Sequence, residues 1–212
     1  MIIDLTHTLK NNITFYPGTL EPLFEQENTI DKDGFAELKL TMCTHTGTHI
    51  DAPCHILPNT KSLSDFPIEK FIGNGISINC SRINSITLDF LKPMENEIKE
   101  VEFILFYTGW HKKWNTPAYF DEFPVLTQQA VEWLLKFKLK AIGFDTISAD
   151  KTTDLHLPNH NLLLKNEVLI IENLKNLDQL IDHEFEFNCI PLKIDNTDGS
   201  PVRAFARNVK IK

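Results

Sequence analysis

The chain has 212 residues, enough for one sizeable hydrophobic core and short for two full domains, so we expect a single domain over residues 1–212. Hydrophobic residues make up 42% of the chain and charged residues 24%, proportions that are ordinary for a soluble globular protein. The formal charge of -8 argues against nucleic acid or an anionic membrane as a partner, because neither attracts a negatively charged protein.

Export and disulfide signals are not evident in the sequence. No apolar run reaches the roughly 20 residues that cross a bilayer, and the start Met-Ile-Ile-Asp-Leu-Thr lacks the basic segment and apolar stretch of a signal peptide. The four cysteines show no paired C-x-x-C spacing, so neither a zinc knuckle nor a disulfide framework is predicted. We therefore expect a cytoplasmic protein.

The first part of the chain is predicted to contain short strands. Residues 2–5 and 12–16 form the first two, and the second ends in Phe15-Tyr16-Pro17-Gly18, a strong turn signal. Residues 24–30 and 35–42 form the next pair, joined by a hairpin-like turn at an Asp-Gly step. In the last of these strands apolar residues alternate with polar ones, which predicts a strand with one buried face.

The next stretch places three of the chain's eight histidines and one aspartate within eleven positions. His45, His49, Asp51 and His55 all have odd numbers, so in an extended segment their side chains would project to one side. Positions four apart in a straight strand lie roughly 13 Å from each other, so the chain must bend for His45 and His49 to share a metal. Gly47 can supply that bend.

The residue types favour a metal site that is open on one side. A helix would also bring the first two histidines together, but threonines and a glycine fill the gap and a proline follows. A His/His/Asp set suits zinc, manganese or iron and leaves coordination positions for water. The alternative is a polar strand whose histidines happen to alternate, or a core histidine pair satisfied by backbone groups.

The run His-Thr-Gly-Thr-His-Ile-Asp-Ala-Pro-Cys-His, which starts at His45, resembles the H-x-G-T-H-x-D-x-P-x-H signature of the cyclase-like metal-dependent hydrolases. Bacterial kynurenine formamidase and isatin hydrolase belong to that family. The resemblance implies that His45, His49 and Asp51 bind metal and that His55 acts as an acid and base.

Periodicity alone predicts eight or nine short strands and two or three helices, an α+β protein dominated by sheet. The resemblance implies more definitely the swivelling β/β/α layered fold of the cyclase-like family, which is commonly a homodimer.

Two aromatic residues are candidates for the wall of the substrate pocket. An aromatic residue before Pro-Gly near the N-terminus helps wall the pocket in the family, which nominates Tyr16; the alternative is a turn whose rings cap the core. Trp110 closes a predicted strand at residues 104–107 within a Thr-Gly-Trp run that the family also shows. Packing against that strand is the alternative for Trp110.

Further along the chain, Thr127 is the predicted N-cap of the clearest helix, which runs through residue 137. A buried strand follows at residues 141–144. It leads into the polar run 145–150, and such a run after a buried strand marks the working edge of an α/β layer.

His160 lies in a short helical pattern and Glu172 ends an apolar strand, and each is unremarkable alone. The order H-x-x-L-L followed by I-I-E-N-L resembles the C-terminal half of the family, however. There the histidine and the glutamate hold a second metal or complete the first site. The resemblance therefore implies that His160 and Glu172 are ligands.

The predicted activity is metal-dependent hydrolysis of a small amide, first of all an aryl formamide such as N-formylkynurenine, a reaction of tryptophan catabolism. We expect one or two divalent ions, zinc before manganese, with Asp51 as the bridge. A bound metal lowers the pKa of water to about 7, and His55 is then available to move the proton.

Two alternatives stay open at this point. Within the enzyme class, isatin-type opening of a lactam or of another small cyclic amide competes with formamide hydrolysis. From another class, a metal-stabilised small-molecule-binding protein would have no turnover. A closed structural site would have four protein ligands and no use for His55.

Overall fold

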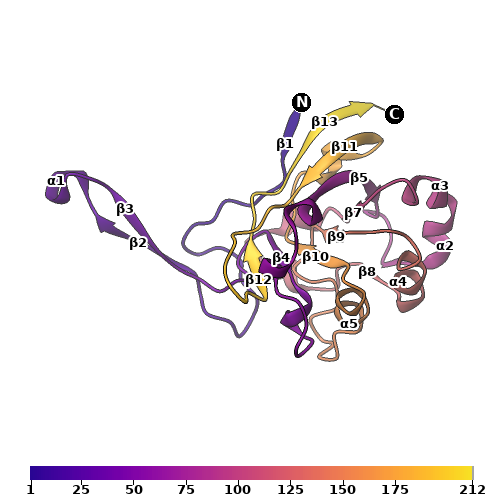
Figure 1. Cartoon of the computed structure of the whole chain (residues 1–212), viewed down its shortest axis with the longest axis horizontal. Helices are drawn as coiled ribbons and strands as arrows, with labels where there is room; N and C mark the ends of the chain where they lie inside the picture. The colour runs from indigo at the N-terminus through magenta and orange to yellow at the C-terminus, as the bar shows by residue number, and fades with distance from the viewer. Residues whose placement is uncertain (212) are drawn as a thin grey trace.

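The computed structural model of the protein describes residues 1–211, and Figure 1 shows a body with a large sheet from which a two-stranded arm projects. The strands are β1 (Ile2–Asp4), β2 (Leu23–Asn28), β3 (Glu37–Thr41), β4 (His49–Asp51), β5 (Ile72–Asn79), β6 (Ser85–Ile86), β7 (Phe103–Tyr107), β8 (Val125–Leu126), β9 (Ala141–Phe144), β10 (Leu169–Glu172), β11 (His183–Asn188), β12 (Gly199–Pro201) and β13 (Phe205–Ile211). The α-helices are α1 (Ile30–Asp33), α2 (Leu88–Leu91), α3 (Glu95–Ile98), α4 (Gln128–Leu134) and α5 (Pro158–Lys165). The α+β class and the predominance of sheet are as the sequence predicts, although very short strands raise the strand number above the expected eight or nine.

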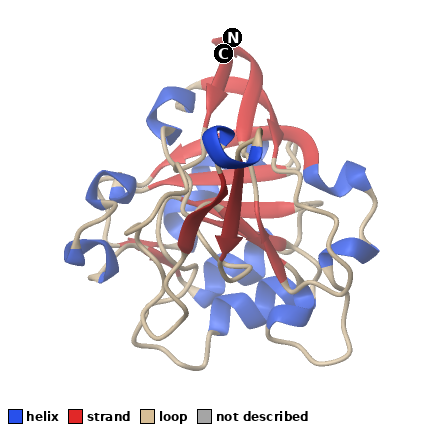
Figure 2. Cartoon of the chain, turned by 90° about the vertical axis from the view of Figure 1, so that its left-hand side faces the viewer, coloured by secondary structure: helices blue, strands red, loops and turns tan. Residues whose placement is uncertain are grey.

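Nine strands form one mixed sheet in the order β1-β13-β11-β5-β7-β9-β10-β4-β12. The central strands β5, β7, β9 and β10 run parallel to their neighbours in this group, whereas the flanking pairs are antiparallel. β1 and β13 pair with each other, so the two ends of the chain lie together, as Figure 2 shows. The arm forms a separate two-stranded sheet of β2 and β3, and β6 pairs with β8 in another.

The large sheet separates two hydrophobic clusters. Successive strand residues point to opposite faces, so that Leu105 and Ile171 belong to one cluster while Ile104 and Ile170 belong to the other. Helices α4 and α5 contribute to the second cluster. Because both faces are covered, β7, β9 and β10 are almost entirely apolar, and the polar side chains of the site lie where these strands end.

Within residues 1–211, no helix has both the length and the apolar character that a membrane span requires.

Two predicted elements differ from the structure. Residues 12–16 form no strand, because their backbone is engaged by a side chain: Thr14 N donates to Asn115 Oδ1 at 2.8 Å, and Asn115 N donates to Thr14 Oγ1 at 2.8 Å. Thr127 caps α4 as predicted, but the helix ends at Leu134 instead of residue 137. Its last turn tightens to hydrogen bonds between residues three apart, such as Phe137 N to Leu134 O at 3.0 Å.

The third difference concerns the arm. The predicted hairpin is present, with Gly34 in the left-handed region (φ 79°) closing α1 before β3. However, Leu38 and Leu40 are 52% and 53% exposed, so the face of β3 that the alternation predicts to be buried is uncovered in the single chain.

Candidate metal centre

Strand β4 carries His49 and Asp51 on the same face, because residues two apart in a strand point to the same side. It lies between β10 and β12, and the register places Glu172 directly opposite His49. Gly47 has φ 68°, so the chain turns before β4 as the sequence predicts. The turn brings His45 back towards the strand, and its Nδ1 lies 2.7 Å from Asp51 Oδ1.

The five predicted ligands lie together in two overlapping groups that share Asp51. The nitrogen and oxygen atoms of His45, His49 and Asp51 lie within 4.8 Å of one another, and so do those of Asp51, His160 and Glu172. His49 Nε2 is 3.3 Å from Asp51 Oδ1 and 3.5 Å from Glu172 Oε2. His160 Nε2 is 3.3 Å from Glu172 Oε1. The geometry therefore joins the two parts of the sequence that the motif analysis nominated separately.

Two of the histidines are held in orientation by a hydrogen bond at Nδ1, the ring nitrogen that faces away from the cluster. Gly47 O accepts from His49 Nδ1 at 2.8 Å, and Asp150 Oδ2 accepts from His160 Nδ1 at 2.7 Å. Carbonyl and carboxylate oxygens only accept hydrogen bonds, so both Nδ1 atoms carry hydrogen and both Nε2 atoms face the cluster. The sequence indicated the polar edge at residues 145–150 but not that Asp150 holds a histidine.

His55 stands beside the cluster in a short 3-10 turn after β4, with its ring centroid 4.0 Å from that of His45. Asp198 connects the two rings, since its Oδ2 is 3.1 Å from His45 Nε2 and 3.4 Å from His55 Nδ1. Sequence reasoning missed Asp198, because an aspartate before a glycine is typical of an ordinary turn. A Cβ at Gly199 would lie 2.6 Å from His45 Cε1, so glycine is required there.

Charge and burial together describe a site for a cation. Burial alone would lower the pKa values of His45 and His49, but nearby carboxylates together outweigh it, Asp51 for both rings with Asp198 beside His45 and Glu172 beside His49. The pKa values rise to about 9 and about 10. His49 Nε2 and both carboxylate oxygens of Asp51 are buried and have no hydrogen-bond partner in residues 1–211. Buried polar atoms normally have hydrogen-bond partners. The lack of partners here fits a site in which these nitrogen and oxygen atoms coordinate a divalent metal.

The two aromatic candidates lie in one aromatic cluster, together with Tyr119. Burial raises the pKa of the Tyr16 hydroxyl, and the negative charge of Glu172 raises it further. Trp110 packs in the same cluster, and its Nε1 donates to Tyr119 O at 3.1 Å. The structure thus places both candidates in one cluster and gives Trp110 a hydrogen bond to the backbone of Tyr119.

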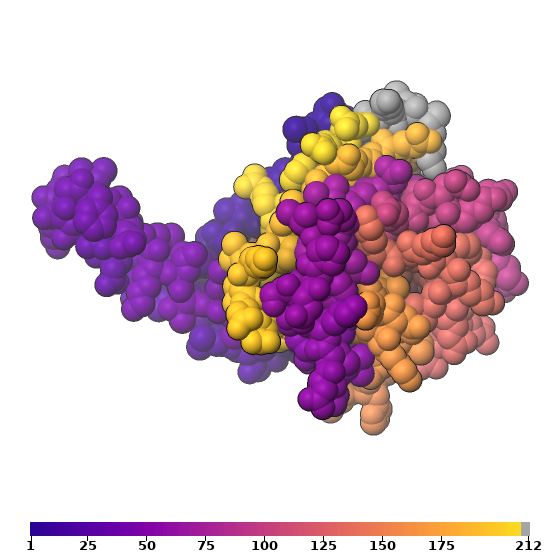
Figure 3. Space-filling view, viewed as in Figure 1, coloured from indigo at the N-terminus to yellow at the C-terminus, as the bar shows by residue number. Residues whose placement is uncertain are grey.

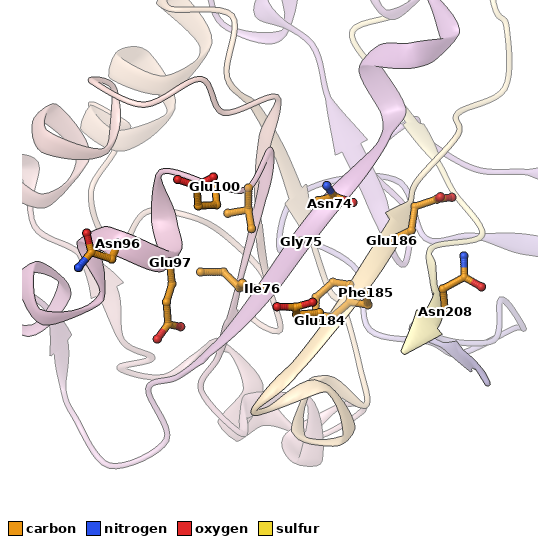
Figure 4. A pocket seen from close by; sticks show the side chains of 11 residues that line it. Asn74, Gly75, Ile76, Asn96, Glu97, Glu100, Glu184, Phe185, Glu186 and Asn208 are labelled. Carbon is orange, nitrogen blue, oxygen red and sulfur yellow. The ribbon is translucent and has the colours of Figure 1, made fainter. Parts of the chain in front are cut away.

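A cavity of about 640 Å³ lies away from this cluster, between β5, α3 and β11. Figure 4 shows the carboxylates of Glu97, Glu100, Glu184 and Glu186 around it. Its lining includes none of the predicted site residues. The chemistry of the site therefore rests on the histidine and carboxylate cluster.

The fold and the cluster place the protein among the sheet-dominated metal-dependent hydrolases. Residues 3–151 match the family model Cyclase, described as "Putative cyclase". The chain is 34% identical over 209 residues to the kynurenine formamidase of Bacillus mycoides, covering 98% of this chain and 97% of that protein. The chain belongs to the cyclase family.

Solved structures agree with this assignment. Isatin hydrolase A from Labrenzia aggregata, bound to benzyl benzoate, superimposes with a TM-score of 0.85 at 29% identity, covering 97% of this chain and 93% of that one. Isatin hydrolase A from Ralstonia solanacearum gives a TM-score of 0.84 at 27% identity, with 97% and 91% covered. The predicted cyclase-like fold is confirmed.

Proposed function

We propose that this protein hydrolyses the C–N bond of a small aryl formamide such as N-formylkynurenine. The observation that carries the proposal is the gathering of three histidines and one glutamate around the shared Asp51, with His55 beside them. The similarity to kynurenine formamidase supports the choice of substrate class. In this reaction water adds to the formyl carbon, the C–N bond breaks, and formate and an aryl amine leave.

His45, His49 and Asp51 would hold one divalent ion, and Asp51, His160 and Glu172 a second. We propose zinc, with manganese as the alternative, because imidazole and carboxylate ligands suit both. When bound, the metal lowers the pKa of water to about 7 and polarises the carbonyl oxygen.

His55 is the proposed proton carrier. It accepts a proton from the attacking water and delivers it to the nitrogen of the leaving amine, which cannot depart as an anion. Asp198 Oδ2, 3.4 Å from His55 Nδ1, favours the tautomer in which the other ring nitrogen is free to accept. Tyr16 is the proposed aromatic wall of the substrate pocket. Trp110, which packs in the same cluster, is the second residue proposed for this wall.

Opening of an isatin-type lactam is the second candidate, and the TM-score of 0.85 to an isatin hydrolase favours it. The bond broken is the same, but the product remains one molecule because the nitrogen belongs to a ring.

A substrate screen separates the two reactions. Metal-loaded and metal-depleted protein are offered N-formylkynurenine, isatin and related small amides, and the metal content of each sample is measured. We expect metal-dependent release of formate from the formamide. Faster turnover of isatin would favour the lactam reaction, and no turnover of any amide by loaded protein would contradict both.

The assembly and location are also proposals. We propose a homodimer, as the family resemblance implies, and a cytoplasmic location, which cell fractionation would test. We further propose that residues 1–212 act as one domain. The pairing of β1 with β13 supports this, because it joins the two ends of the chain in one sheet.

A further inference from the structure

A second group of metal-binding side chains lies on the outer side of the buried cluster, where Asp198 meets His45 and His55. The nitrogen and oxygen atoms of these three residues lie within 4.8 Å of one another. Their side chains are 42%, 21% and 28% exposed, whereas those of His49 and Asp51 are 3% and 1% exposed. This outer group of Asp198, His45 and His55 is therefore the part of the site that ions in solution can reach directly.

The carboxylate of Asp198 is held in place at both ends of its residue. The backbone O of Asp198 accepts from Ala52 N at 2.8 Å, just after β4. Oδ1 accepts from Thr44 Oγ1 at 2.9 Å, which leaves Oδ2 to face both histidine rings. β12 pairs with β4, and in Figure 3 the gold surface near β12 lies beside a purple surface from the earlier part of the chain.

The spacing in the outer group suits metal ligands. His55 Nδ1 lies 3.4 Å from Asp198 Oδ2, farther than in an ordinary N–H···O hydrogen bond. Two ligand atoms that each lie about 2.1 Å from a tetrahedral zinc ion are about 3.4 Å apart. In the buried cluster His160 Nε2 and Glu172 Oε1 have a similar separation of 3.3 Å. The outer group therefore holds a nitrogen and an oxygen at the separation that zinc requires.

His45 limits how the outer group can bind a metal. Its Nδ1 lies 2.7 Å from Asp51 Oδ1 and its Nε2 lies 3.1 Å from Asp198 Oδ2, and a neutral imidazole has a free lone pair on only one nitrogen. While His45 Nδ1 binds a buried ion, its Nε2 carries hydrogen and donates to Asp198. His55 and Asp198 are then the two protein ligands left for an outer ion. Zinc sites in proteins usually have three or four protein ligands, so an outer ion with two binds only when zinc is in excess.

We propose that His55 and Asp198 bind one further zinc ion, and that this ion inhibits the enzyme when zinc is in excess. The inference rests on the proposed function, in which His55 carries the proton. Zinc occupies the lone pair of His55 Nδ1, so the single hydrogen of the neutral ring moves to Nε2. Nε2 then accepts no proton from the attacking water, and hydrolysis stops while the buried ions stay in place.

The test measures bound zinc and turnover on the same samples. Metal-depleted protein is dialysed against increasing buffered concentrations of zinc, and zinc per chain is measured together with hydrolysis of N-formylkynurenine. For wild type we expect the rate to rise as the buried positions fill and to fall as one further ion binds. Return to lower zinc should restore the rate. Manganese binds a given set of ligands more weakly than zinc, so the same concentrations of manganese should not inhibit zinc-loaded protein.

Asp198→Asn removes the carboxylate and leaves a side chain of nearly the same size. Loss of a group that only supports a ligand typically costs about 10- to 100-fold in metal affinity, so loss of a direct ligand should raise the inhibitory zinc concentration at least about tenfold. Each protein is compared with its own maximum rate. Asp195→Asn makes the same change at an exposed aspartate of the same segment and should behave as wild type. His55→Ala, followed by bound zinc alone, should also lack the further ion.

The other outcomes separate failure of this inference from failure of the proposed function. No further ion in wild type, or one that persists in both Asp198→Asn and His55→Ala, would overturn the outer position. Equal inhibition of wild type and Asp198→Asn would overturn it as well. A further ion that binds without inhibition would overturn its effect on His55. If no amide is hydrolysed at any zinc concentration, the proposed function fails, and loss of the further ion in both variants would still support the outer position. Circular dichroism checks that each variant is folded.

Discussion

Replacing Asn173 with glycine should weaken metal binding, although Asn173 is not among the predicted ligands. This buried residue links the two halves of the site. Its Nδ2 donates to Gly47 O at 2.9 Å, the carbonyl that also accepts from His49 Nδ1, and its Oδ1 accepts from Tyr119 OH at 2.9 Å. Asn173 therefore holds the group that orients His49.

Glycine is the informative replacement because Asn173 has φ 57°, in the left-handed region where glycine carries no strain. Two buried hydrogen bonds are lost. Tyr119 OH keeps a second acceptor, Asp145 O at 3.3 Å, and Gly47 O keeps His49, so neither group is left wholly unpaired. We therefore expect a loss of about 2–3 kcal/mol in the free energy of unfolding, about 1 kcal/mol or slightly more for each bond. Loss of such a support for a ligand typically costs about 10- to 100-fold in metal affinity.

Asn176→Gly is the matched control. Asn176 also has a left-handed φ of 58°, and its Nδ2 donates to Asp4 O at 2.9 Å, away from the metal cluster. We expect a loss of about 1 kcal/mol in stability and unchanged zinc affinity. The assay is zinc competition against a chelator of known affinity, with thermal unfolding of the metal-free proteins alongside. Equal zinc affinities for the Asn173 and Asn176 variants would refute the reasoning.

The other predictions concern the cluster itself. Chelation should abolish turnover, and added zinc or manganese should restore it; full turnover by demonstrably metal-free protein would contradict the mechanism. His160→Ala and Glu172→Ala should each lower the metal stoichiometry or affinity without unfolding the protein. Unchanged metal content in either variant would show that the replaced residue is structural and not a ligand. His55→Ala should keep most of its metal and lose about 10²- to 10⁴-fold in turnover, as is typical of a general acid and base. The control His156→Ala, at an exposed position, should change neither metal content nor turnover. If the His55 variant instead loses metal in proportion to activity, His55 is a ligand.

The metal-binding stretch could be predicted because its residues lie close together in the sequence. The argument that odd-numbered residues share one face of a strand holds for only some of them. His49 and Asp51 share a face because they belong to one strand. His45 lies in the turn before that strand and His55 in the 3-10 turn after it, so alternation along a strand does not apply to them. They converge because the chain bends at Gly47 and again after β4.

The residues that support the ligands could not be predicted in the same way. Asp198 and Asn173 lie more than a hundred positions from the histidines they serve, and they reach them because β12 and β10 both pair with β4. Nothing in the sequence near either residue specifies that pairing. An asparagine after a strand and an aspartate before a glycine are typical of turns, and their role depends on which strand edge the turn meets.

Two strand predictions differ from the structure, and the two differences have different physical causes. At residues 12–16 the expected strand is absent, and Thr14 instead forms hydrogen bonds with Asn115 through its backbone N and its side-chain oxygen. In β3 the strand is present, and its expected burial is not. Alternation of apolar and polar residues arises where one face of a strand is removed from water, and a single chain leaves Leu38 and Leu40 half exposed. The alternation in β3 correctly predicts which side chains share a face, but it cannot specify what covers that face, because burial depends on surfaces far from the strand in the sequence.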